Sequence, residues 1–312
     1  MEVTTFIFPL VKLIFYVSLG VFIGNLIEGL NWTRFLAKLA YPLIKLGHLK
    51  DISGASFSLA FFSGISANTM LAEAYEQGKL GRKELILSNL FNSLPTYFLH
   101  LPTTFFIIAP FIKEATYPYF SLTVGAAFFR TILIVFIARF ILPKPEDICL
   151  SCHLTEEKMN FKTILKKTWK RFQKRFKKIL LYTLPIYTLF KVLAHYNFFH
   201  WLEQKMSFML KFLTWFPAKA LSVVVLQMAA EFSAGVAAAG ALLEARALSV
   251  KEIVLALMIG NILSSPIRAI RHQFPYYAGI YKPQTAALLI LFNQSLRVVS
   301  LALALFLYYS FF

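Results

Sequence analysis

Long apolar runs, separated by short polar segments, cover most of the chain. The runs at 6–30, 117–142 and 284–309 each reach the roughly 20 residues that a helix needs to cross the hydrocarbon core of a bilayer. Few charged residues interrupt them. The pattern therefore predicts an all-helical polytopic membrane protein, located in the cell membrane.

The stretch 61–104 is equally apolar but carries many small polar side chains and prolines. Such groups, and the backbone that proline frees, are tolerated at membrane depth only where they are buried in protein or line a wet cavity. We therefore predict that residues 53–76 form a re-entrant hairpin and that 83–112 form a helix broken at its prolines, both along a polar path. The prolines in question are Pro95, Pro102 and Pro110.

The same order of features returns about 170 residues further along the chain. A second hairpin is expected at 218–243 and a second broken helix at 252–280, before the last apolar run. The alternative is that apolar segments of this kind resemble each other by chance. The matched residues are Ser63 and Ser233, Lys83 and Lys251, Asn92 and Asn261, Pro95 and Pro266, and Arg130 and Arg297.

The segment 143–178 differs in kind, because it holds 11 Lys or Arg against four acidic residues. From Leu165 onward its apolar residues recur at steps of four and three, which predicts an amphipathic helix with a basic face. We expect this linker to lie on the anionic lipid of the cytoplasmic leaflet. The alternative is a docking site for an acidic partner.

Charge also predicts the topology. The formal net charge of +17 is assigned to cytoplasmic segments and anionic lipid rather than to nucleic acid. Placing both the linker and the basic, interfacial segment 32–51 in the cytoplasm requires an even number of crossings between them. Each repeat, 1–142 and 179–312, then makes three crossings plus a hairpin. The second repeat is thus inverted, with both termini outside.

Several charged residues lie inside apolar runs, where they are costly and usually functional. We expect Glu231 to pair with Arg268 or Arg271; the alternative is an ion pair that only fixes helix packing. Arg130 and Arg297 are further candidates unless they snorkel to the interface, and the asparagines are candidates unless they only bind helices together. The predicted path comprises Ser63, Gly64, Ser66, Asn68, Asn89, Asn92, Glu231, Ser233, Asn261, Ser264, Arg268, Arg271 and His272, with His100, Arg130 and Arg297 as secondary candidates.

The linker contains a CxxCH pattern formed by Cys149, Cys152 and His153. Alone, this is the c-type haem attachment pattern, but haem is attached on the exported side and the linker is too basic for export. The two thiolates and the imidazole are a weak zinc or iron candidate, because a fourth ligand is not evident. An incidental loop is the alternative. No nucleophile, metalloprotease or P-loop motif is present, so we do not expect an enzyme.

Two short stretches, GISAN at 64–68 and NLFNSLPTY at 89–97, resemble the Gate domain, also called the nucleoside recognition domain. This domain occurs in ferrous-iron transport B proteins and spore maturation membrane proteins. The resemblance implies an inverted-repeat pore similar to concentrative nucleoside transporters. This chain has neither the cysteine of the iron transporters' gate nor a GTPase domain, so it looks like a stand-alone relative.

These observations favour a secondary transporter for a small polar solute, nucleoside-like or anionic, which works alone or as a homo-oligomer. Glu231 and His272 are the candidates for proton coupling. Two other hypotheses stay open: a permease for divalent metal ions, and a membrane scaffold or signalling partner that acts through the basic linker.

Overall fold

The computed structural model describes residues 33–145, 216–229 and 232–311, with a few isolated positions between 162 and 196. Every regular element in this part of the chain is helical. Three helical segments are long and apolar enough to cross a membrane: Arg82–Ile141, Val250–Arg268 and Pro283–Phe311. The predicted helical class is confirmed, and its helices suit a membrane location.

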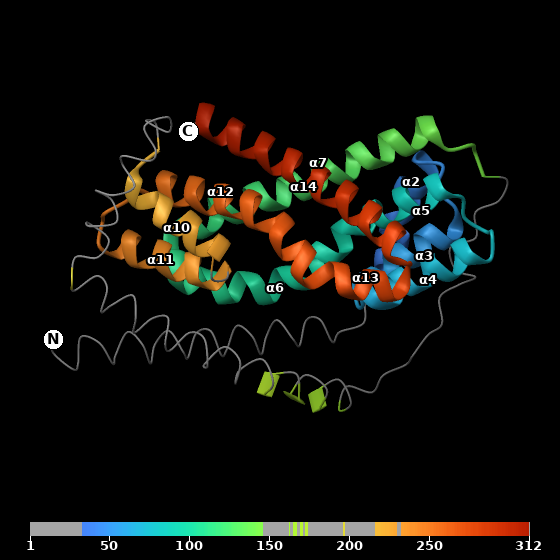
Figure 1. The fold of residues 1–312 in the computed structure, drawn as a ribbon, viewed down its shortest axis with the longest axis horizontal. Coiled ribbons are helices and arrows are strands. Elements are labelled where there is room, and N and C mark those ends of the chain that lie inside the picture. The colour runs from blue at the N-terminus through green and yellow to red at the C-terminus, as the bar shows by residue number, and fades with distance from the viewer. Residues whose placement is uncertain are drawn as a thin grey trace.

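The first half of the described chain forms a helical hairpin, a pair of consecutive helices and one long helix (Figure 1). Ser63 caps the second arm of the hairpin and so fixes where it begins. The elements are α2 (Thr33–Leu46), the hairpin helices α3 (Asp51–Ala60) and α4 (Gly64–Glu76), then α5 (Arg82–Phe91), α6 (Ser93–Ile112), the short η1 (Lys113–Ala115) and α7 (Thr116–Ile141).

The second half of the described chain is built from six helical elements. A hairpin is followed by an interrupted helix and a long final helix. The interruption is a π-helical segment, a form frequently found at functional sites. The elements are α10 (Ala218–Ala229), α11 (Phe232–Glu244), α12 (Val250–Arg268), the π segment η3 (Ala269–Gln273), α13 (Phe274–Ile280) and α14 (Pro283–Phe311).

The predicted helix breaks need correction. Pro102 and Pro110 lie inside α6 and do not break it, because neighbouring helices and hydroxyl side chains can satisfy the backbone groups that proline frees. The break lies at Asn92, and Pro95 follows within the first turn of α6, where the missing N–H of proline costs least. Pro266 also lies inside α12, and the irregular segment begins at Ala269.

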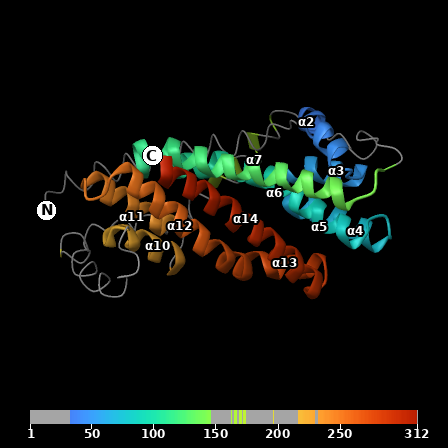
Figure 2. The same ribbon diagram turned by 90° about the horizontal axis from the view of Figure 1, so that it is seen from above.

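The two hairpins lie at opposite ends of an elongated molecule, and α7 and α14 pack against each other between them (Figures 1 and 2). Separate apolar clusters hold each region together. Ile44, Phe57 and Ile134 join α2 and α3 to α7. The largest cluster joins α10, α11 and α12 to α6 and α7.

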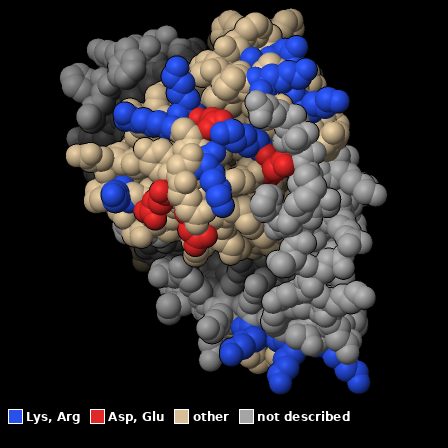
Figure 3. All heavy atoms as spheres, turned by 90° about the vertical axis from the view of Figure 1, so that its right-hand side faces the viewer, with Lys and Arg blue, Asp and Glu red and all other residues tan. Residues whose placement is uncertain are grey.

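The long helices expose apolar side chains, whereas charged side chains gather at the end formed by α2 to α5 (Figure 3). Ile132 and Phe136 of α7 and Phe306 of α14 are among the exposed apolar side chains. At the charged end, Lys50 and Glu84 form an ion pair at 3.0 Å. An apolar belt with a charged end is the surface expected of a protein that contacts lipid along its sides.

Candidate functional site

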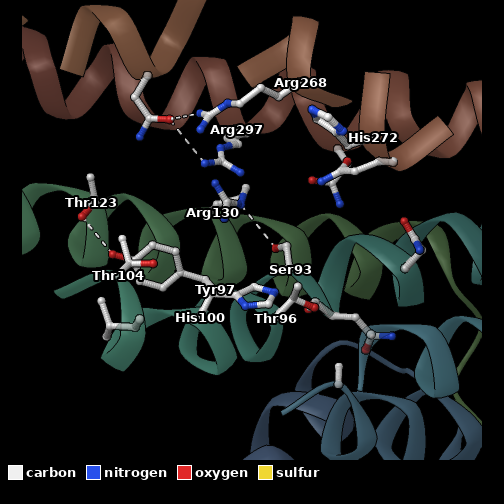
Figure 4. A pocket seen from close by; sticks show the side chains of 18 of the residues that line it. Ser93, Thr96, Tyr97, His100, Thr104, Thr123, Arg130, Arg268, His272 and Arg297 are labelled. Carbon is white, nitrogen blue, oxygen red and sulfur yellow. Dashed lines mark hydrogen bonds between the residues drawn. The ribbon is translucent and has the colours of Figure 1, made fainter. Parts of the chain in front are cut away.

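A cavity of about 480 Å³ lies between the two halves of the protein. Its wall combines residues of α3, α4, α5, α6 and α7 with residues of α11, α12, α13 and α14. Figure 4 shows the side chains that surround it. Two groups of polar residues face this space, one rich in arginine and one rich in amides.

The arginine cluster consists of Arg130 on α7, Arg268 on α12 and Arg297 on α14, which point toward one another (Figure 4). Arg130 is buried, with 6% of its surface exposed. Its Nε donates to Ser93 Oγ at 3.3 Å and its Nη1 donates to Ser300 Oγ at 3.2 Å. These partners are neutral, so they orient the guanidinium without cancelling its charge.

Asn261 orients the other two arginines. Its Oδ1 accepts hydrogen bonds from Arg268 Nη2 at 3.1 Å and from Arg297 Nη2 at 3.4 Å. Its Nδ2 donates to the Tyr119 hydroxyl at 3.5 Å. One buried amide therefore fixes two guanidiniums from different helices and connects them to α7 of the first half.

The amide cluster lies where α4 and α5 meet α13. Asn89 Nδ2 donates to Asn68 Oδ1 at 2.8 Å and to the Tyr277 hydroxyl at 3.3 Å. The Tyr281 hydroxyl donates to the same Asn68 oxygen at 3.0 Å. Asn92 Nδ2 donates to Ser56 Oγ at 2.6 Å, which ties α5 to the hairpin. These bonds hold polar groups at fixed positions in the cavity wall.

Hydroxyl side chains complete the wall. Tyr97 and Thr123 form a hydrogen bond at 2.9 Å across α6 and α7, and Ser93, Thr96 and Thr104 lie nearby (Figure 4). Ser93 and Thr96 belong to the polar stretch 61–104 that was predicted to line the path, whereas Thr123 lies outside it. Tyr119 and Thr123 gave no signal because α7 reads as an ordinary apolar span.

The structure brings together most of the sequence-selected candidates within its described part. Four described candidates lie outside the cavity wall. Two of these, Ser63 and Ser66, hydrogen-bond to each other at 3.0 Å as part of the α4 cap. Ser233 and Ser264 also lie outside this wall. Those that line the cavity are Gly64, Asn68, Asn89, Asn92, His100, Arg130, Asn261, Arg268, His272 and Arg297.

Other candidates lie outside the described residues. Glu231 is one of them, as is the side chain of Arg271, so the expected ion pair stays a prediction. The Cys149, Cys152 and His153 pattern and most of the basic linker also fall outside. The metal and lipid roles of the linker therefore remain predictions.

The chemistry of the cavity is that of a hydrogen-bond donor site with positive charge. Among its described lining residues none is acidic and none is cysteine. The described part of the chain also contains no group of three or more His, Cys, Asp or Glu residues that could hold a metal ion. The arrangement suits a polar or anionic ligand.

Similar proteins were found in one archaeon. Three uncharacterized proteins of Methanocaldococcus jannaschii are 26%, 25% and 22% identical to this chain over 89%, 91% and 87% of its length. The alignments cover 86%, 89% and 88% of these relatives. No family model matches the chain. No solved structure matches it either.

Proposed function

We propose that the protein is a membrane permease that binds a small polar solute in the cavity between its two halves, with anionic solutes favoured over neutral, nucleoside-like ones. The observation that carries this proposal is the arginine cluster, because three cationic side chains line the cavity and no described lining residue is acidic. Ionisable residues at membrane depth usually mark a solute pathway.

An inverted repeat would provide the two-sided access that a permease needs. The matching spacing of helix starts in the two halves supports such a repeat. The hairpin helices α4 and α11 both have 13 residues and begin 168 positions apart, at Gly64 and Phe232. The following helices, α5 and α12, begin at Arg82 and Val250, again 168 positions apart.

The turn after each hairpin repeats in detail. Gly78 and Arg246, 168 positions apart, both have positive φ angles, of 71° and 52°. Each turn leads into a helix whose first turn carries a glutamate that accepts a hydrogen bond from the backbone N–H three residues earlier. Glu84 accepts from Gly81 at 2.6 Å, and Glu252 accepts from Ser249 at 2.7 Å. The shared left-handed residue and the shared glutamate contact support a common structural unit.

The directions of the helices support inversion. The long helices α7 and α14 run in opposite directions across the middle of the molecule (Figure 1). The contacts between the halves are reciprocal, since α6 packs on α11 and α13 packs on α4. Arg130 and Arg297 occupy the same position in α7 and α14, 14 residues after the first residue of each helix.

The resemblance to Gate domains is consistent with this proposal. The GISAN and NLFNSLPTY stretches contribute Gly64, Asn68, Asn89, Asn92 and Tyr97 to the cavity wall. The stretches that carry the resemblance thus contribute to the proposed solute site. Coupling to protons through His272, which lines the cavity, and Glu231 belongs to the same proposal.

The other hypotheses receive less support. A divalent cation would be repelled by the arginine cluster, and the cost of bringing like charges together is large in a medium of low dielectric constant. A scaffold role would rest on the basic linker, most of which lies outside the described residues.

Uptake into proteoliposomes tests the permease. The probes are labelled phosphate, succinate, uridine and manganese(II). Thr96→Trp places a large side chain in the cavity, while Ile132→Trp places it on the outer face of α7, where Ile132 is 62% exposed. We expect saturable uptake of an anion or uridine that Thr96→Trp abolishes and Ile132→Trp retains.

Three results would contradict the proposal. Saturable uptake of manganese alone would favour a metal permease. Uptake that is the same in Thr96→Trp would place the pathway elsewhere. Uptake of no probe, by protein that melts cooperatively, would count against transport.

A further inference from the structure

The arginine cluster has a specific geometry. Its guanidiniums come from α7, α12 and α14, and so approach one space from different directions (Figure 4). Arg268 and Arg297 both donate to a single oxygen of Asn261, so these two cations lie close together. Arg130 reaches the same space from α7, beside Arg297 (Figure 4).

No acidic residue among the described ones lines the cavity beside this cluster, and Glu231, which is expected to pair with Arg268 or Arg271, lies outside them. The hydrogen-bond acceptors recorded for it are the Ser93 and Ser300 hydroxyls and the Asn261 amide. Cations held together at membrane depth repel one another and are costly without compensating negative charge. A monovalent anion would offset only part of the three charges, whereas a dianion would offset two of them.

The arrangement of the guanidinium N–H donors also indicates the shape of the anion. A guanidinium presents its N–H groups as a planar fork that matches two oxygens of a carboxylate or phosphate. Three forks from different directions suit an anion whose oxygens also point in several directions, which a tetrahedral oxyanion provides and a flat carboxylate does not. Tyr119 adds a hydroxyl whose oxygen accepts from Asn261 and whose proton can be donated into the cavity that it lines.

We propose that Arg130, Arg268 and Arg297 form a binding site for a dianionic tetrahedral oxyanion of the phosphate type, either free or as the head of a small monoester. Asn261 is a positioning residue, because its Oδ1 holds the guanidinium groups of Arg268 and Arg297 in place. This inference rests on the proposed function, since it names the class of solute that the same cavity takes.

Calorimetric titration of the detergent-purified, full-length protein tests the site directly. The titrants are inorganic phosphate, glycerol 3-phosphate, succinate and glycerol, at low salt and mildly alkaline pH, where phosphate carries close to two charges. We expect at least one phosphate compound to bind, with succinate at least about tenfold weaker and no binding of glycerol. Tighter binding of glycerol 3-phosphate than of phosphate would identify a monoester, and the reverse would identify the free anion.

Substitutions in the arginine cluster test whether phosphate binds there. Arg297→Gln removes one fork and should weaken phosphate binding at least about tenfold. Arg139→Gln is the matched control, because Arg139 lies on the same helix as Arg130 but is exposed and donates to the Leu46 carbonyl at 3.2 Å. It should bind as the unmodified protein does. Asn261→Asp keeps the shape of the side chain, and its carboxylate should pair with the arginines and abolish binding.

The inference is overturned if the folded protein binds neither phosphate compound, or if binding survives both Arg297→Gln and Asn261→Asp. Its failure is distinguishable from failure of the permease. Saturable uptake of uridine or succinate without phosphate binding would overturn the phosphate-type site but would leave the permease supported. Phosphate binding without uptake of any probe would support the oxyanion site and overturn the permease.

Discussion

At the scale of single residues, close approach of the backbones decides which positions tolerate a side chain. Gly240 of α11 faces the backbone of α6, and a Cβ atom there would lie 2.7 Å from the Phe111 carbonyl oxygen. Small residues at such contacts are what let membrane helices approach closely. A Cβ atom at Gly235 would likewise lie 2.9 Å from the Val223 carbonyl oxygen of α10.

We predict that Gly240→Ala destabilises the protein by about 1–3 kcal/mol, because α6 and α11 must separate to admit the methyl group. Thermal unfolding in detergent, followed by circular dichroism, measures the effect. Gly125→Ala on α7 is the control, since nothing lies within 4 Å of a Cβ atom there. The control should be neutral or slightly stabilising, because alanine favours helix over glycine. Equal melting temperatures for the two variants would contradict the predicted contact.

At the scale of elements, α13 is held against α4 by polar groups as well as by apolar packing. The Tyr281 hydroxyl donates to Asn68 Oδ1 at 3.0 Å, and Leu71, Tyr277 and Leu289 pack beneath it. This contact joins the end of the interrupted helix in one half to the hairpin of the other. It therefore fixes one wall of the cavity.

We predict that Tyr281→Phe lowers stability by about 0.5–1.5 kcal/mol, the net value of one hydrogen bond. The same change in an Asn68→Ala background should cost clearly less, because the acceptor is already absent. A thermal double-mutant cycle in detergent gives both numbers. Tyr117→Phe on α7, where Tyr117 is 75% exposed, is the control and should change nothing. Equal costs in both backgrounds would mean that the hydrogen bond does not hold α13 in place.

At the scale of the whole molecule, the turns that follow the two hairpins lie at opposite ends (Figure 1). Gln77 and Ala245 are exposed and directly follow α4 and α11, 168 positions apart. An inverted repeat puts equivalent turns on opposite sides of the membrane. The basic residues Lys79, Arg82 and Lys83 follow the first turn, which favours the cytoplasm for that side.

We predict that Gln77→Cys is labelled by an impermeant maleimide only from the cytoplasmic side and Ala245→Cys only from outside. Both are made after replacement of Cys149 and Cys152 by serine. Intact cells and inside-out vesicles provide the two sides, and labelling of the denatured protein controls for reactivity. Labelling of both positions from one side would exclude an inverted arrangement.

The sequence alone located much of the fold. The hairpins expected at 53–76 and 218–243 correspond to α3–α4 and α10–α11, and the long helices α7 and α14 begin within one residue of their predicted starts. These features could be read from local pattern, because a membrane span must satisfy its own backbone and cover it with apolar side chains. The same reasoning placed helix breaks at Pro102 and Pro110, where packing in fact lets α6 continue.

What the sequence determined by itself is therefore the set of helices and the polar residues that they carry, since hydrophobicity and length act locally. Only the tertiary structure decided which polar residues meet. Ser63 caps a helix, whereas Arg130 and Arg297, 167 positions apart, line the same cavity. The reason is that capping uses groups a few residues away, while a cavity is formed by the packing of helices distant in the chain, which no local pattern records.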